Sequence, residues 1–212
     1  MSSNKLNFKI NVYFSLVPAF TREQAISMKS IEKWKILKTD IPLDNKWCTV
    51  HKDTVELPSG KIIDDYFVNI RPEVVLVLPV TADGKAIMVR QYKHGAKEVL
   101  LEFPGGVFDP GDGSAETAAL RELREETGYD TANIEQLGVV YDNPTKDSNQ
   151  IFFFLAHNVE KLHETEFDIT EDIETIEVPL DEIPGLIKGG KIRVSGSIAI
   201  YYMAMAVLNT KA

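Results

Sequence analysis

The sequence is poor in three features that would each define a class of protein. It has one cysteine, Cys48, in 212 residues, so no disulfide can form within the chain and a reducing, cytoplasmic setting is expected. No apolar run approaches the roughly 18 residues that a membrane-spanning helix needs. The four histidines show no HExxH-like spacing, which argues against a zinc site. These absences favour a soluble protein with no membrane partner.

Positive charge is also scarce. The chain has 23 Lys and Arg against 32 Asp and Glu, a net charge of −9 and a pI near 5.0. This balance argues against binding of a nucleic-acid backbone. A small anionic substrate remains compatible with it, because a bound Mg²⁺ ion would reverse the local field. With 44% hydrophobic and 26% charged residues, the chain has the composition of an ordinary globular protein.

The order of patterns divides the chain into three parts. Residues 1–30 form an N-terminal extension whose role the sequence leaves open. Residues 31–71 favour several short antiparallel strands, with a turn at Leu57–Gly60. No Gly/Ser-rich or charged linker follows this region, so we expect it to pack on the next part or on a second subunit. Residues 72–212 form that next part.

The third part alternates strand-like and helix-like segments. Glu73–Val80 is a continuous apolar run, as expected of a strand buried on both faces. Helices on both sides of such strands predict an α/β/α sandwich around a mixed sheet. Further strands are expected near 86–92, 98–104, 135–141, 150–156 and 175–180, and helices over 115–127, 181–188 and 197–208.

The most strongly patterned stretch runs from Gly105 to Tyr129. Ser114 favours the start of a helix and Gly128 its left-handed end. One face of this helix carries small apolar side chains that can pack on a sheet. Opposite that face, three carboxylates at positions i, i+3 and i+4 share one stripe: Glu122, Glu125 and Glu126.

Those carboxylates admit two interpretations. Most charged helical faces are solvated surface, and Arg121 and Glu125 form an i, i+4 pair. Like charges at this spacing, however, cost about 0.2–0.5 kcal/mol per pair on an isolated helix. Mg²⁺ or Mn²⁺ would compensate them, because both ions prefer carboxylate and carbonyl oxygens. The Gly105–Gly106 turn would let the backbone approach such an ion.

This stretch resembles the Nudix box, G-x5-E-x7-R-E-U-x-E-E-x-G-U, where U is a bulky apolar residue. The closing half matches from Arg121 to Tyr129. The first half departs twice: Asp112 stands at the glutamate position, and eight residues rather than seven separate it from Arg121. The additional residue, around Gly113, leaves the geometry of this loop open. The resemblance implies the Nudix α/β/α sandwich, here with an N-terminal antiparallel β region.

Other segments resemble the ADP-ribose pyrophosphatases of that family. Val89–Lys93 is similar to their VRQYR strand and Leu101–Gly106 to their LELPAG motif, and Pro144 lies fifteen residues past Tyr129, where they have a proline. The resemblance implies Mg²⁺-dependent (or Mn²⁺-dependent) hydrolysis of the pyrophosphate bond of ADP-ribose or a related nucleoside diphosphate sugar. Asp147–Gln150 departs from their Ser-x-Glu-like sequence, which leaves GDP-mannose open.

The resemblance also implies roles for the patterned stretch. Glu122 and Glu126 are the expected metal ligands, with Glu125 ligating directly or through water. The carbonyl of Gly105 is a further expected ligand. Arg121 would orient the acids through salt bridges, a supporting catalytic role.

The general base and the substrate contacts are expected elsewhere in the chain. Glu171, on the acidic stretch 168–174, is the expected base, and Glu174 is the second choice. A buried structural pair is an equal alternative for Glu102. The expected substrate-binding residues are Arg90, Lys93, Glu102 and Pro144.

Two alternatives stay open. One is a Nudix hydrolase of another substrate, such as GDP-mannose or a dinucleoside polyphosphate. The other is a non-catalytic nucleotide-sensing Nudix module, which is less favoured because such modules usually lose an acid of the triad. Nudix hydrolases of this kind are often homodimers that share their N-terminal strands, so the expected partners are a nucleotide sugar and a second copy of this chain.

Overall fold

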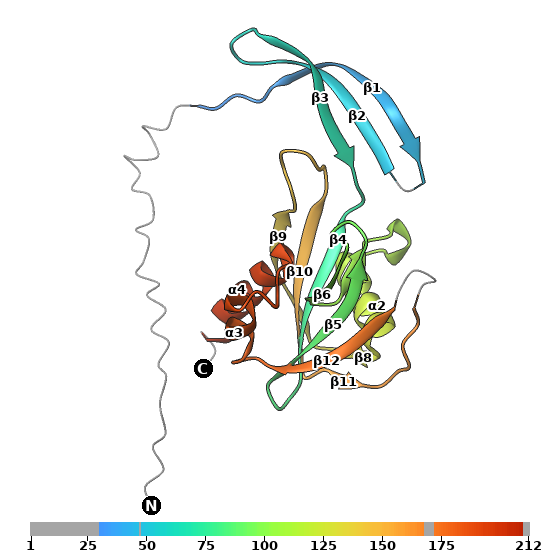
Figure 1. The fold of residues 1–212 in the computed structure, drawn as a ribbon, viewed down its shortest axis with the longest axis vertical. Helices are drawn as coiled ribbons and strands as arrows, with labels where there is room; N and C mark the ends of the chain where they lie inside the picture. Colours follow the sequence, from blue (N-terminus) through green and yellow to red (C-terminus); the bar gives the residue numbers. More distant parts are fainter. Residues whose placement is uncertain (1–29, 47, 168–171, 210–212) are drawn as a thin grey trace, which may run out of the picture.

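The computed structural model describes residues 30–46, 48–167 and 172–209. A three-stranded antiparallel sheet lies beside a larger layered unit (Figure 1). The predicted turn is confirmed, because the Gly60 amide donates to the Leu57 carbonyl at 2.8 Å between the second and third strands. The small sheet has the order β1 (Lys35–Asn45), β2 (Cys48–Glu56) and β3 (Ile62–Ile70).

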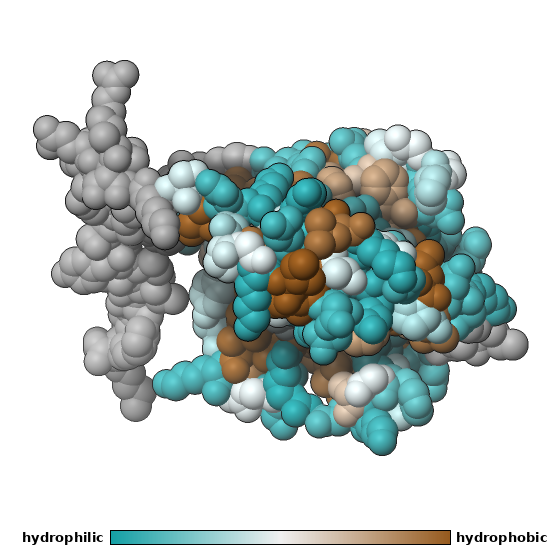
Figure 2. Space-filling model, turned by 90° about the horizontal axis from the view of Figure 1, so that it is seen from above, coloured by the Kyte–Doolittle hydropathy of each residue, from teal (hydrophilic) through white to brown (hydrophobic). Residues whose placement is uncertain are grey.

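The second half of β3 makes hydrogen bonds to the larger unit. There the Asn69 amide donates to the Lys146 carbonyl at 2.7 Å, and the Tyr66 hydroxyl donates to the Thr145 carbonyl at 2.8 Å. β1 is exposed along its whole length. Seen from the side of this sheet, apolar residues lie among polar ones (Figure 2). Among the described residues, these hydrogen bonds therefore join the small sheet to one loop, the one before β10.

The larger unit contains a mixed sheet, as expected. Its order is β12-β5-β4-β10-β9, with β6 paired to β5 and β7 to β4. β10 runs parallel to β4, and the other pairs are antiparallel. The strands are β4 (Val74–Val80), β5 (Lys85–Lys93), β6 (Glu98–Glu102), β7 (Gly105–Val107), β9 (Ile134–Tyr141), β10 (Gln150–His157) and β12 (Ile173–Pro179). Two short strands, β8 (Tyr129–Asp130) and β11 (Glu160–Lys161), pair separately.

The central strand β4 is buried on both faces, which confirms the interpretation of its apolar run. Successive side chains of a strand point to opposite faces. Val75 and Val77 belong to the core on the side of α2 (Ala115–Thr127), whereas Leu78 and Val80 belong to the core on the side of α4 (Ser195–Leu208). The two helices thus cover opposite faces, and the α/β/α sandwich is confirmed.

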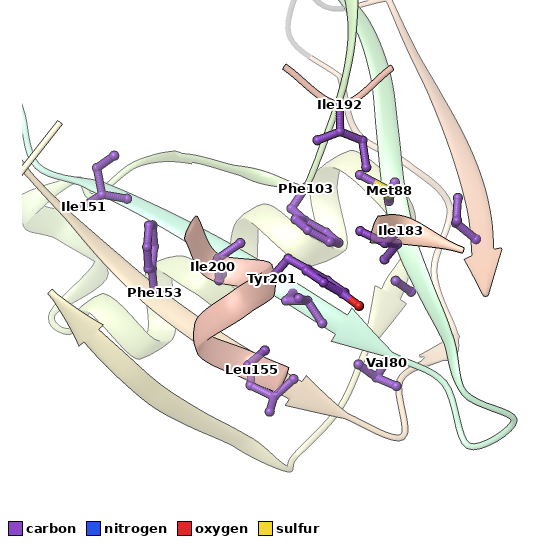
Figure 3. Close-up of a cluster of buried hydrophobic side chains, with 14 residues drawn as sticks. Val80, Met88, Phe103, Ile151, Phe153, Leu155, Ile183, Ile192, Ile200 and Tyr201 are labelled. Carbon is purple, nitrogen blue, oxygen red and sulfur yellow. The ribbon is translucent and has the colours of Figure 1, made fainter. Parts of the chain in front are cut away.

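The core on the side of α4 is the larger of the two. Ile200 and Tyr201 of α4 lie near Phe103 and Phe153 (Figure 3). α4 begins two residues before its expected start, and within its first turn the buried Ser197 hydroxyl accepts a hydrogen bond from the Phe103 amide at 3.1 Å. A short helix, α3 (Ile183–Lys188), precedes it. No helix among the described residues is long and apolar enough to cross a membrane.

Helix α2 has the bounds that the sequence predicted. The Ser114 side chain accepts a hydrogen bond from the Thr117 amide at 3.1 Å, and Gly128 ends the helix in the left-handed conformation, with φ of 74°. Both signals are local, so they could be located from the sequence. The face toward the sheet consists of fully buried small or apolar residues: Ala118, Ala119 and Leu123.

Candidate active site

A double-glycine turn brings the backbone of β7 against helix α2. Gly105 lies so close to β4 that an added Cβ would be 2.3 Å from the Val75 carbonyl oxygen. A Cβ on Gly106 would be 2.5 Å from the carboxylate carbon of Glu122. The first glycine therefore permits strand pairing, and the second leaves room for an acid of the helix.

Arg121 organises two of the three clustered acids. Its Nη1 donates to Glu122 Oε1 and to Glu125 Oε2, each at 2.9 Å. Its Nε and Nη2 donate to the two oxygens of Asp112 at 2.8 and 3.0 Å, and Nη2 also donates to the Val107 carbonyl at 3.0 Å. The bond to Asp112 is the largest of the effects that raise the pKa of Arg121, so the guanidinium stays charged.

Glu126 occupies a different environment from the other two acids. Its side chain is buried, and Oε2 accepts a hydrogen bond from the Gly105 amide at 2.9 Å. The prediction that all three carboxylates lie opposite the packed face of α2 is therefore wrong for Glu126. This acid belongs to the buried edge of the helix because the glycine turn supplies a backbone donor there.

These residues line a cavity of about 830 Å³. Its lining includes six carboxylates and two cationic side chains. The lining also includes the backbone of the glycine turn and one aromatic residue, Phe167. The carboxylates are Asp109, Asp112, Glu122, Glu125, Glu126 and Glu166, and the cations are Lys93 and Arg121. A cavity with this excess of acids suits a cation far better than a bare phosphate.

The structure brings one of the expected substrate-binding residues to this cavity. Lys93 lines the cavity, and its Nζ lies 3.2 Å from Oε1 of the buried Glu102. Glu102 therefore has the structural pairing that the sequence left as an alternative. Arg90 donates to Glu174 on the neighbouring strand through Nε at 2.7 Å. Pro144 is exposed on the loop before β10. Arg90, Glu102 and Pro144 are not in the lining that the described residues form.

The two expected bases have different positions. Glu171 lies outside the described residues. Glu174 is held by Arg90 through both Nε and Nη2. Its role as second choice for the base would require this ion pair to open.

Sequence reasoning missed Glu166 and Phe167 in the cavity lining. The segment after β10 crosses the end of α2, where the His163 amide donates to the Gly128 carbonyl at 3.0 Å and the Glu166 amide donates to the Glu125 carbonyl at 2.9 Å. These backbone contacts join residues about 40 positions apart and leave no local pattern. Only the tertiary structure could reveal them.

The acids fit a divalent ion by chemical type and position. Mg²⁺ and Mn²⁺ prefer the carboxylate and carbonyl oxygens gathered here. In the arrangement shown, Glu122 and Glu125 bond to Arg121, and no three His, Cys, Asp or Glu side chains among residues 30–46, 48–167 and 172–209 already form a group that could hold an ion. Ion binding would therefore require these carboxylates to move closer together around one ion, which each can do while one of its oxygens still bonds to Arg121.

Comparison with known proteins identifies the class. Residues 70–195 match the NUDIX domain, and residues 34–69 match the nucleoside diphosphate sugar hydrolase N-terminal domain. The chain belongs to the Nudix family, whose hydrolases generally use a divalent metal ion.

Individual relatives narrow the comparison. The ADP-ribose pyrophosphatase of Bacillus subtilis is 33% identical over 180 residues, covering 84% of this chain and 96% of that protein. The methanol dehydrogenase activator of Bacillus methanolicus is 31% identical over 173 residues, covering 81% and 92%. A crystal structure of an ADP compounds hydrolase has a TM-score of 0.78 and 24% identity, covers 87% of this chain and 99% of that chain, and supports the fold. This protein is a Nudix hydrolase related to ADP-ribose pyrophosphatases.

Proposed function

We propose that this protein hydrolyses the pyrophosphate bond of ADP-ribose or a related nucleoside diphosphate sugar, with Mg²⁺ or alternatively Mn²⁺. The observation that carries this proposal is the cavity in which six carboxylates meet two cations beside the glycine turn. A diphosphate would be repelled by these acids unless a divalent cation lay between them. The similarity to the Bacillus subtilis ADP-ribose pyrophosphatase supports the choice of substrate.

The proposed ligands are the carboxylates of Glu122, Glu125 and Glu126 and the carbonyl of Gly105. The ion, when bound, would neutralise the phosphates and polarise the attacking water. Arg121 bonds to two of the acids, and its positive charge offsets the repulsion between them. Lys93 adds a positive charge that can attract a phosphate oxygen.

Hydrolysis adds one water across the P–O–P bridge. The water oxygen bonds to one phosphorus, the bridging P–O bond breaks, and its electron pair leaves with the other phosphate. The water proton passes to a carboxylate, for which we propose Glu171, with Glu174 as second choice. The products are two phosphomonoesters, a nucleoside monophosphate and a sugar phosphate.

Two other functions are tested beside this one. GDP-mannose or a dinucleoside polyphosphate would present the same diphosphate to the same acids. A non-catalytic nucleotide-sensing module is disfavoured because Glu122, Glu125 and Glu126 are all present and all line the cavity.

We further propose a division into an extension (1–30), an N-terminal β region (31–71) that forms a dimer contact, and a Nudix hydrolase domain (72–212). The matched ranges meet at residues 69 and 70, which supports this boundary. The exposed apolar residues of β1 support a homodimer. The single cysteine, Cys48, is exposed and supports a reducing, cytoplasmic location.

A product screen over a panel of diphosphate compounds tests the function. ADP-ribose, GDP-mannose and a dinucleoside polyphosphate would be incubated with the full chain and Mg²⁺ or Mn²⁺, and products separated by chromatography. We expect AMP and ribose 5-phosphate from ADP-ribose. Faster cleavage of another compound would reassign the substrate, and calorimetric binding without any product would favour the sensing module.

A further inference from the structure

The loop between β7 and α2 departs from the Nudix pattern and still reaches Arg121. Asp112 ends a single 3-10 turn, η1 (Pro110–Asp112). Both of its carboxylate oxygens accept hydrogen bonds from Arg121, Oδ1 from Nε at 2.8 Å and Oδ2 from Nη2 at 3.0 Å. This parallel pair fixes the plane of the guanidinium as well as its position.

The turn holds Asp112 from the backbone side too. The Asp112 side chain accepts a hydrogen bond from the Asp109 amide at 2.9 Å, and the Asp109 side chain accepts one from the Gly111 amide at 2.8 Å. The chain leaves the turn at Gly113, whose φ is 76° and whose Cβ position is open space. The turn therefore folds the longer loop back on itself and carries a short side chain to the arginine.

We propose that the shorter acid and the additional residue compensate each other, so that Asp112 is a positioning residue for Arg121 and, through it, for Glu122 and Glu125. Aspartate is one methylene shorter than glutamate, and the extra residue lets the turn make up this reach. Arg121 Nη1 bonds both acids, so the plane that Asp112 imposes decides where their oxygens lie. The inference rests on the proposed function only for the consequence of this positioning, namely metal affinity.

Two single changes and their combination test the compensation. Asp112→Glu lengthens the acid, deletion of Gly113 shortens the loop, and the combined variant has the spacing of the Nudix pattern. Asp112→Asn keeps the shape of the side chain and removes its charge. Asp130→Asn is the matched control, because Asp130 also accepts bonds from an arginine of α2, Arg124 Nε and Nη2 at 3.2 and 2.9 Å, but does not line the cavity.

The first readout is the affinity of the full chain for Mn²⁺ without substrate, measured by electron paramagnetic resonance. We expect Asp112→Asn and each single loop change to weaken Mn²⁺ binding about tenfold or more, as loss of a supporting partner commonly does. The combined variant should recover wild-type affinity, and Asp130→Asn should retain it. Wild-type affinity in Asp112→Asn, or a combined variant weaker than both single changes, would overturn the proposal.

The Nε–H signal of Arg121 in ¹⁵N NMR spectra of the metal-free protein gives a second readout. It should be protected from exchange in the wild type and the combined variant, and less protected in Asp112→Asn, whose amide can accept only one of the two guanidinium bonds. If the wild type bound no Mn²⁺, the proposed function would fail while this signal still decided the positioning role. Equal protection in the wild type and Asp112→Asn would contradict that role.

Discussion

Glu126 makes a contact that sets it apart from the other two acids of its helix. It is 4% exposed, and its Oε2 accepts the Gly105 amide, so it joins α2 to the glycine turn. Glu122 and Glu125 instead bond to Arg121. One acid is thus held by a backbone amide and two by a charged side chain.

Replacing Glu126 by glutamine should separate its two roles. The amide oxygen of Gln can still accept the Gly105 bond, so the melting temperature should change little. Loss of the negative charge should lower turnover of ADP-ribose by at least about 100-fold, as expected for a metal ligand. Glu116→Gln, on an exposed site in the first turn of α2, is the control for circular dichroism and steady-state kinetics. Full activity in Glu126→Gln would remove Glu126 from the metal site.

Glu102 should make stability depend on pH. Burial, the largest cause, raises the pKa of Glu102 above its ordinary value of 4.5, and the ion pair with Lys93 lowers it only in part. The unfolded chain therefore ionises at lower pH than the folded one. The stability linked to this group is present below pH 4.5 and is lost as pH rises through the folded-state pKa.

The Glu102→Gln variant lacks this dependence. We would measure the free energy of unfolding of both proteins by urea denaturation. As pH rises from 4.5 through the folded-state pKa, the wild type should lose stability relative to Glu102→Gln. Glu98→Gln, on an exposed site of the same strand, is the comparison. A difference between wild type and Glu102→Gln that is constant over this range would contradict the assigned cause.

At the level of elements, strand β7 begins with two glycines whose replacement should have different consequences. Gly106→Ala would place Cβ 2.5 Å from the flexible end of Glu122, so this side chain should move and the fold should keep its stability to within about 1 kcal/mol. Gly105→Ala would meet the fixed backbone of Val75 at 2.3 Å and should cost about 1–3 kcal/mol or more.

Urea denaturation and ADP-ribose turnover would be measured on both alanine variants. Gly106→Ala should lose activity with little loss of stability, because a displaced Glu122 could no longer serve as the proposed metal ligand. Gly105→Ala should mainly lose stability, with a lower free energy of unfolding than the wild type and Gly106→Ala. Equal destabilisation by the two changes, or normal turnover in Gly106→Ala, would be inconsistent with this assignment.

Local signals explain which elements could be predicted. Ser114 and Gly128 are local signals for the ends of α2, and the unbroken apolar run Glu73–Val80 predicted a strand between two layers. Burial of Glu126 could not be predicted, because it depends on a backbone donor 21 positions away. Glu166 enters the cavity through a contact with Glu125 that has no sequence signature.

At the level of the whole molecule, the small sheet is the unusual feature. Strand β1 is exposed throughout and carries four large apolar side chains that would normally be covered. These side chains and their exposed fractions are Ile36 61%, Leu37 44%, Ile41 54% and Leu43 45%. The sequence predicted strands here but could not tell which surface covers them. The two candidates are the larger unit, which is distant in sequence, and a second copy of the chain.

We predict that the full chain sediments as a dimer through this sheet. Changing Ile36 and Ile41 together to Asp should give a folded monomer in sedimentation velocity, because both side chains are already exposed within one chain. Leu162→Asp, which is equally exposed on the larger unit at 62%, should leave the dimer intact. A wild-type chain that sediments as a monomer at micromolar concentration would refute this dimer contact.

The central claim is that the acids around the glycine turn require a divalent ion to cleave a diphosphate. ³¹P NMR of ADP-ribose with the full chain follows the diphosphate and monophosphate signals together. The account predicts no change in the presence of a chelator, and conversion of the diphosphate signals to two phosphomonoester signals once excess Mg²⁺ is added, or after reaction with Mn²⁺ that is chelated before the spectrum is recorded. Conversion that is as fast with the chelator as with excess metal would contradict it. So would the absence of conversion with both Mg²⁺ and Mn²⁺.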